Sequence, residues 1–374
     1  MRNPFKYTHT VTDQAFCNRV KEQDQLYRFI QNSQNVLIYA PRRTGKSSLI
    51  KQVLKNIEDR EAGIGIVYAD IYGTTSESEF VNRVLKEVGG LKSSIEKMMA
   101  FLTKNFKSIP FKVGMDPNTF SLTLTYDAPA GDKDGQLETL MVLLEKLSKD
   151  RNLVVVFDEF QAIAGYSEGN LFEKKLRSFI QQHDNICYIF AGSQKHLLTT
   201  MFQSQDRAFY QQATSFPLSD INKKEYMPWL TEKFSVCRNP VPRAALEEIL
   251  RRMEYHPMLI QFFCYFLWEE MQVRAYDEDL LDAIEKQIIE NKKFEYQAIW
   301  DSLSPNQKKV LKLVLKNDGK NLFSAKSLVD MELKTGSVVR QCLNSLCDKD
   351  LLEKIGKGYI ITDLFLRKWL ATQS

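Results

Sequence analysis

Residues 35–50 read NVLIYAPRRTGKSSLI. The apolar run from Val36 to Tyr39 is long enough for one buried strand. Residues 40–47 then match the pattern G-x-x-x-x-G-K-[ST], except that Ala40 stands where the first Gly is usual. Apolar residues after Ser47 recur at helical spacing, so we expect the loop to join a strand to a helix. In this context the pattern typically binds phosphate groups.

Each residue type in this loop has a chemical reason. Backbone N–H groups of such a loop form an anion-binding concavity at a helix N-terminus. Gly45 lets the backbone approach a phosphate closely. Lys46 brings a positive charge to the β- and γ-phosphates, and the Ser47 hydroxyl can bind Mg²⁺. Average residue frequencies give about 0.03 chance matches in a chain of this size, so we interpret the loop as a nucleotide site.

The composition is that of an ordinary globular protein with room for two or three domains. The 374 residues include 51 basic and 47 acidic ones, and this small excess does not by itself indicate nucleic-acid binding. The six cysteines form no C-x-x-C pair and the four histidines do not cluster, so we expect buried free thiols and no protein metal cage. Without a signal peptide or a membrane-length apolar run, we expect a cytoplasmic protein with no membrane partner.

A second chemical signal lies at residues 153–160, LVVVFDEF. This apolar strand ends in two adjacent acids, and burying charge without a partner is expensive. In the same sheet as a phosphate loop, the two acids would have a catalytic function. Asp158 can hold Mg²⁺, and Glu159 can orient and deprotonate an attacking water.

The order of apolar strands and helices predicts an α/β fold. GIVYADI at 65–71 and ICYIFAG at 186–192 are further buried strands with helical patterns between them. We therefore expect a P-loop NTPase parallel sheet with helices on both faces over residues 1–215, and ligands at the carboxyl ends of its strands. Residues from about 104 to 130 alternate like a β-hairpin inserted into this core.

The rest of the chain reads as mostly helical. Residues 216–297 are expected to form a helical lid domain, with helices over 223–234, 243–255, 257–272 and 277–295. Residues 298–374 then give helix, helix, helix and hairpin, which is the order of a winged helix-turn-helix domain. Ser337 is a possible N-cap of the third of these helices.

The winged-helix pattern leaves two kinds of partner open. Its third helix is expected to expose Arg340, Gln341, Asn344 and Ser345, and lysines at 334, 349, 354 and 357 flank it and the hairpin. This face is only modestly basic, whereas DNA-binding helices usually make many phosphate contacts. DNA contact and a protein-binding surface are both consistent with it.

Several isolated residues allow two interpretations. Ser193 or Gln194, at the end of the last buried strand, would sit beside the γ-phosphate, although polar residues also simply end strands. Arg207 would be an arginine finger or, more commonly, a surface residue. His256 precedes Pro257 at a helix start, where it would face the nucleotide or be satisfied locally.

The segment before the phosphate loop is also open to two interpretations. FCNRVKE at 16–22 begins a helix whose apolar face we assign to Phe16, Val20, Leu26, Phe29 and Ile30. Its charged residues favour a solvated helix face. A cover over the adenine is the alternative.

These motifs together resemble the archaeal-type prokaryotic ATPases, AAA+-related proteins grouped with the STAND signal-transduction ATPases. FCNRVKE is similar to that family's F-x-G-R-x-x-E entry motif, APRRTGKSSL to its G-x-R-R-x-G-K-[ST]-S-L loop, and VVVFDEFQ at 154–161 to its D-E-F-Q box. AGS at 191–193 resembles its first sensor, and HP at 256–257 the end of its G-x-H-P motif. Asn18, Ala40 and Glu254 replace the usual Gly.

The resemblance implies ATP and Mg²⁺ between core and lid, with hydrolysis moving the lid and the winged helix. The residues expected at the nucleotide are Arg19, Pro41, Arg42, Arg43, Thr44, Gly45, Lys46, Ser47, Ser48 and His256. Those expected to act in catalysis are Lys46, Asp158, Glu159 and Ser193, and those expected to bind the metal are Ser47 and Asp158. A slow ATPase switch with an unidentified protein partner follows, with assembly into a homo-oligomer on activation left open.

Three other functions compete with this switch, and one of them, a small-molecule P-loop kinase, leaves the winged helix unexplained. A DNA-gripping ATPase, such as an initiator or defence factor, would use the winged helix on duplex DNA. A nucleotide-binding scaffold without activity would not need Asp158 and Glu159, so the acids argue against it.

Overall fold

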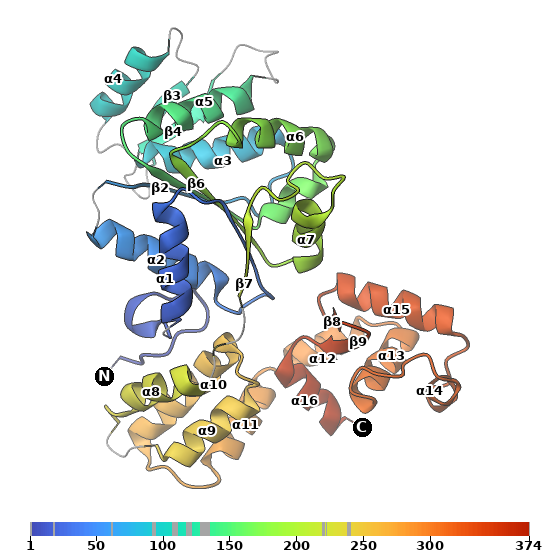
Figure 1. Cartoon of the computed structure of the whole chain (residues 1–374). Helices are drawn as coiled ribbons and strands as arrows, with labels where there is room; N and C mark the ends of the chain where they lie inside the picture. The colour runs from blue at the N-terminus through green and yellow to red at the C-terminus, as the bar shows by residue number, and fades with distance from the viewer. Residues whose placement is uncertain are drawn as a thin grey trace. The chain divides into compact units, whose positions relative to one another are not determined.

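The computed structural model describes residues 2–17, 19–60, 63–91, 95–106, 111–116, 122–127, 135–218, 221, 223–237 and 241–373 (Figure 1). The chain divides into two compact units. The first is Met1–Lys233 with Glu254–Phe262, and the second is Phe234–Met253 with Phe263–Ser374.

The first unit is built on a parallel sheet, which in the described residues has five strands. Their order is β2 (Gly65–Asp70), β5 (Leu153–Asp158), β6 (Ile186–Gly192), β1 (Val36–Tyr39) and β7 (Thr214–Pro217). The predicted α/β parallel sheet is therefore confirmed. Strand β7 was not predicted, because only Phe216 in it is buried and so it lacks an apolar run.

Side chains of the central strands alternate between two cores, as the two-residue period of a strand requires. On one face they meet α3 (Glu77–Gly89), α5 (Gln136–Ser148), the short 3-10 helix η2 (Phe160–Gly165), α6 (Gly169–Ile180) and α7 (Lys195–Gln203). On the other they meet α1 (Val20–Gln31) and α2 (Lys46–Arg60). Figure 1 shows these helices on both sides of the strands. Val20 is 51% exposed, so its assignment to the apolar face of α1 was wrong; it is the first residue of α1 and lies outside the buried stripe of Leu26 and Ile30.

A small insertion packs on α3, and it contains the hairpin that was expected within residues 104–130. It comprises α4 (Ile95–Asn105) and an antiparallel hairpin of β3 (Phe111–Met115) and β4 (Leu122–Tyr126). At the end of α3, the backbone of β4 approaches Gly89 so closely that a Cβ there would lie 2.8 Å from the carbonyl carbon of Leu122. Glycine at this position is therefore a packing requirement.

The helical region contains α8 (Lys223–Phe234), α9 (Arg243–Arg252), α10 (Pro257–Val273), α11 (Leu280–Asn291) and α12 (Lys293–Asp301). Two predicted helices differ from these bounds. Helix α9 ends before Glu254 and Tyr255, because both residues have a positive φ that no right-handed helix accommodates. The predicted single helix 277–295 is two helices, because Lys292, with ψ near 0°, interrupts it.

The last part of the chain has the predicted winged-helix order. It contains α13 (Pro305–Lys316), α14 (Ala325–Asp330), α15 (Gly336–Asp348), the antiparallel hairpin of β8 (Leu352–Ile355) and β9 (Gly358–Ile361), and α16 (Leu364–Thr372). The N-cap of α15 is Thr335, whose hydroxyl accepts from the backbone N–H of Val338, so the assignment to Ser337 was wrong. Within the second unit, α16 is tied to α11 by an ion pair between Lys368 and Glu285 at 2.5 Å.

The structure also bears on the cysteines and on membrane-spanning helices. Five of the six cysteines, all within the described residues, are buried, and Cys347 is half-buried. Among the described helices, none is both long and apolar enough to cross a membrane.

Gly89 offers a direct test of the hairpin packing. We expect Gly89→Ala to lower the free energy of unfolding by about 1–3 kcal/mol, because the new Cβ collides with β4 backbone that cannot rotate away. Gly90→Ala is the matched control: Gly90 is in the right-handed helical region, and its Cβ would meet only the Glu87 carbonyl at 3.4 Å. Urea denaturation measures both, and equal stabilities of the two variants would contradict the close approach.

Candidate functional site

The phosphate loop joins β1 to α2 with a backbone of alternating handedness. Arg43 and Gly45 have φ of 65° and 91°, whereas Thr44 between them is not among the residues with positive φ. Such alternation turns successive N–H groups inward, which makes an anion-binding concavity. The Thr44 hydroxyl donates to the carbonyl of Pro41 at 2.8 Å and closes the turn. Ala40 also lacks a positive φ, so an alanine is compatible with the start of this loop.

Asp158, at the end of β5 and 4% exposed, is the centre of a polar network. Its Oδ1 accepts from the Lys46 ammonium and from the backbone N–H of Glu159 at 3.0 Å. Its Oδ2 accepts from the Ser47 hydroxyl at 2.7 Å and from the Tyr68 hydroxyl. Burial raises the pKa of Asp158, but the Lys46 charge and these hydrogen bonds outweigh burial and leave the pKa below its ordinary value.

Tyr68 is a site residue that the sequence did not indicate. It lies on β2, which pairs with β5, and its hydroxyl donates to the Asp158 carboxylate. Burial and then the charge of Asp158 raise the pKa of Tyr68, so its phenol stays a hydrogen-bond donor. The only available signal was a hydroxyl in the otherwise apolar strand core GIVYA.

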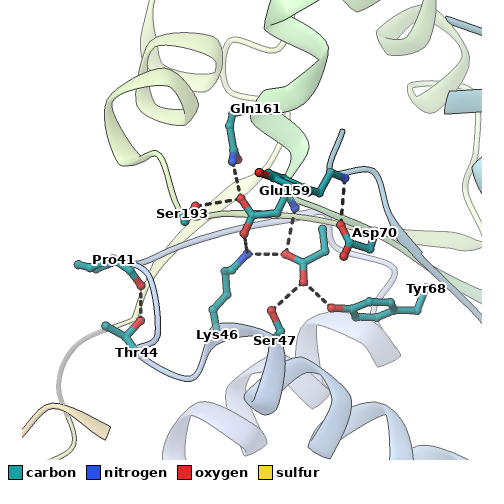
Figure 2. A network of polar contacts seen from close by, with 11 residues as sticks. Pro41, Thr44, Lys46, Ser47, Tyr68, Asp70, Glu159, Gln161 and Ser193 are labelled. Carbon is teal, nitrogen blue, oxygen red and sulfur yellow. Dashed lines mark hydrogen bonds and ion pairs between the residues drawn. The ribbon is translucent and has the colours of Figure 1, made fainter. Parts of the chain in front are cut away.

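Glu159 lies beside Asp158 and is held by donors on three sides. Its Oε1 is 3.3 Å from the Lys46 ammonium. Its Oε2 accepts from the Ser193 hydroxyl at 2.9 Å and from the side-chain amide of Gln161 (Figure 2). The structure thus brings together Lys46, Asp158, Glu159 and Ser193. Of the two strand-end candidates it is Ser193 that joins this network, and the side chain of Gln194 is exposed.

The N-terminal segment makes hydrogen bonds to the phosphate loop and to the start of α2. Arg19 is only 1% exposed, and its guanidinium donates to the Thr44 carbonyl at 3.2 Å and to Glu22 at 3.1 Å. The Ser48 hydroxyl, also buried, accepts from the backbone N–H of Val11 at 3.1 Å. Arg19 is therefore not part of a solvated helix face, and it holds the backbone of the loop.

The remaining predicted nucleotide residues lie at exposed or locally bonded positions. Pro41, Arg42 and Arg43 are exposed at the tip of the loop. His256 is half-buried at the start of α10, where its Nδ1 accepts from the backbone N–H of Leu259 at 3.4 Å. This cap-like bond agrees with the interpretation of His256 as a locally satisfied helix-start residue.

The donor set of the network suits a magnesium nucleotide. The Ser47 hydroxyl and an Asp158 carboxylate oxygen lie 2.7 Å apart, and oxygen ligands of this kind are those that Mg²⁺ prefers. The Lys46 ammonium and the N–H groups of the loop are suited to phosphate oxygens.

Arg207 lies in a different environment from that of an arginine finger. Its guanidinium makes a bidentate ion pair with Glu173 of α6, in which Nε of Arg207 lies 3.2 Å from Oε2 of Glu173. Glu173 is only 1% exposed, and burial raises its pKa while the bonds from Arg207 lower it in part. The pair fixes the segment after α7 to α6, which is a structural role.

We expect Arg207→Ala to lower the free energy of unfolding by about 1–3 kcal/mol at pH near 8, because it leaves the buried Glu173 carboxylate unpaired. Without Arg207 the pKa of Glu173 in the folded state rises further above its unfolded value. A carboxyl with a raised folded pKa stabilises the fold when protonated, and this contribution is lost as the pH rises. The loss should thus be smaller at pH near 5, as urea titrations at both pH values would measure. Adding Glu173→Gln should remove this pH dependence, and equal losses at both pH values would contradict the assignment.

Solved structures of other proteins share the fold of nearly the whole chain. A Walker-type ATPase of Pyrococcus abyssi is 18% identical, with 98% of this chain and 99% of that chain covered at a TM-score of 0.63. The ORC2 protein of Aeropyrum pernix, in ADPNP–ADP complexes, is 14% identical, with 96% and 97% covered at a TM-score of 0.53. A search of curated proteins finds no match.

Family comparisons identify the parts of the chain. Residues 294–372 match a probable winged helix domain, which agrees with α13 to α16. Residues 16–262 match an ATPase domain predominantly from Archaea, and this match spans more than half of the chain. The resemblance inferred from the sequence motifs is confirmed. The chain therefore belongs to this family of ATPase domains found predominantly in Archaea, and it carries a C-terminal winged helix.

Proposed function

We propose that this protein is an ATP-hydrolysing molecular switch, in which turnover of Mg-ATP changes the position of a helical lid and a winged helix. The observation that carries the proposal is the network at the carboxyl edge of the sheet, where Lys46, Ser47, Asp158 and Glu159 meet. A binding scaffold without activity would have no use for the second acid.

The proposed mechanism assigns one task to each group. Lys46 binds the β- and γ-phosphates together with the N–H groups of the loop. Ser47 and Asp158 hold Mg²⁺, which when bound neutralises phosphate charge. Glu159 orients the attacking water and accepts its proton, while Ser193 holds the Glu159 carboxylate.

The helical region and the winged helix supply the part that moves. In this proposal residues 1–215 form the ATPase core, 216–297 the lid and 298–374 the winged-helix domain. The Lys368–Glu285 ion pair joins α16 to α11, and the Tyr296 hydroxyl donates to Asp363 at 3.2 Å. These contacts support movement of α11, α12 and the winged helix as one body. A regulatory STAND-like role in the cytoplasm, with a protein partner and assembly of copies on activation, belongs to the same proposal.

The first test separates binding from hydrolysis. We expect Glu159→Gln to keep ATP affinity within a few-fold and to lower phosphate release at least about 100-fold, because the general base is lost. Lys46→Ala should instead lose ATP binding, because it removes the cation that meets the phosphates. A fluorescent ATP analogue measures affinity.

The matched control is Glu168→Gln, which makes the same change at an exposed acid a short way along the chain. It should leave both affinity and phosphate release unchanged. Undiminished phosphate release by Glu159→Gln would refute the proposed hydrolysis mechanism.

Duplex-DNA binding is the second candidate, and the exposed polar face of α15 favours it. Arg340, Gln341 and Asn344 are exposed there, as are the flanking lysines 334, 349, 354 and 357. Against it, Arg340 is the only basic residue on α15, and Asp348 offsets its charge. Specific DNA binding usually needs more phosphate contacts than this helix offers.

We therefore expect duplex DNA to bind no tighter than the nonspecific range, about 10⁻⁴–10⁻⁶ M at physiological salt. Fluorescence anisotropy at two salt concentrations measures this. Tight, salt-dependent binding that Arg340→Ala with Lys354→Ala weakens, but Lys149→Ala in the first unit does not, would replace the switch by the DNA-binding function.

A further inference from the structure

Gln161 contacts the proposed general base, although the proposed mechanism gives it no task. It lies in η2, two residues after Glu159, and is 7% exposed. Its Nε2 donates to the Oε2 of Glu159, the same oxygen that accepts from Ser193 (Figure 2). The amide and the hydroxyl thus hold one carboxylate oxygen from two different elements, η2 and the end of β6.

The oxygen of the Gln161 amide is buried at a cost to stability, which indicates that the contact made by its nitrogen matters. Among the described residues, its Oε1 is buried with no hydrogen-bond partner. An unpaired buried amide oxygen is destabilising. A residue selected only for packing would be apolar here, so the structure tolerates Oε1 in order to keep Nε2.

Gly192 leaves the room that this amide needs. A Cβ at Gly192 would lie 3.1 Å from Cδ of Gln161 and closer still to Oε1. It would also lie 2.9 Å from Cδ1 of Leu198, so both side chains would have to shift. Any larger residue at the end of β6 would push Gln161 away from Glu159.

The backbone of Glu159 also needs to be held. Its φ is 57°, in the left-handed region that non-glycine residues seldom adopt. Such a conformation persists only when its surroundings fix it. Hydrogen bonds to Oε2 fix the side chain at this strained position.

We propose that Gln161 is a positioning residue that, with Ser193, anchors Oε2 of Glu159 and so leaves Oε1 directed toward the reaction. Oε1 now faces the Lys46 ammonium at 3.3 Å. When Lys46 engages phosphate, Oε1 is the oxygen left to receive a proton from water. The inference rests on the proposed hydrolysis function and adds Gln161 as the residue that orients Glu159, the general base.

The kinetic test uses Gln161→Met, which keeps the length of the side chain and removes the amide. We expect kcat to fall about 10–100-fold, because a misplaced base loses its alignment, while ATP affinity stays within twofold. In the Glu159→Gln background the same change should alter the rate less than twofold. Gln181→Met, at an exposed glutamine, is the control and should match the wild type. An unchanged kcat, or an equal fall in both backgrounds, would overturn the inference.

A second measurement does not depend on hydrolysis. In nucleotide-free protein, Gln161→Met should lower Tm, because it removes a donor from a carboxylate. In the Glu159→Ala background it should raise Tm, because the amide there is buried with no partner for Nε2. Equal falls in Tm would overturn the positioning role. Full phosphate release by Glu159→Gln would overturn the proposed function instead, so the two failures are distinguishable.

Discussion

The structure depends on placing one lysine and two carboxylates together at the edge of a buried sheet. Lys46 is 6% exposed and lies against Asp158 and Glu159. Each charge would be costly alone, and removing one partner from such a cluster exposes the full penalty of the other. Because β6 lies between β1 and β5 in the sheet, the phosphate loop has to bring the start of α2 across β6 to meet Asp158. The short Ser47 side chain reaches the same carboxylate at 2.7 Å, so the path of the loop places both residues there.

Those parts of the fold that depend on local chemistry were predictable from the sequence. Apolar runs gave the buried strands, and the loop and the paired acids gave the core of the site. The side chains that adjust the acids were not predictable, because their contacts depend on how strands lie side by side. Tyr68 precedes Asp158 by 90 residues, and only the pairing of β2 with β5 brings them together. The helix end before Glu254 was missed for a different reason: glutamate is a good helix former, and the positive φ was signalled only by the Gly that the resembled motif usually has at this position.

Isolated basic residues were the hardest to interpret, because the sequence around a single arginine does not reveal which group its side chain will bind. Arg207 is bound by a glutamate 34 residues earlier in the chain, and Arg19 by a carbonyl 25 residues later. Both side chains support backbone segments, which is a task that no local motif encodes. A buried carboxylate such as Glu173 is the feature that decides between a free and a structural arginine.

The same charge cluster explains how nucleotide binding would start a movement. Lys46 cannot hold two carboxylates and a set of phosphates at once. When it turns to the phosphates, Asp158 and Glu159 lose their compensating charge and repel each other. A divalent cation held by Ser47 and Asp158 would restore the balance, so binding of nucleotide and of cation should favour each other. Glu159 meanwhile keeps its anchors on Gln161 and Ser193, so the rearrangement is confined to the lysine side of the network. The switch would then begin when the Lys46 ammonium exchanges its ion pairs with the two carboxylates for ion pairs with phosphate. Glu159, the proposed base, would already be in position.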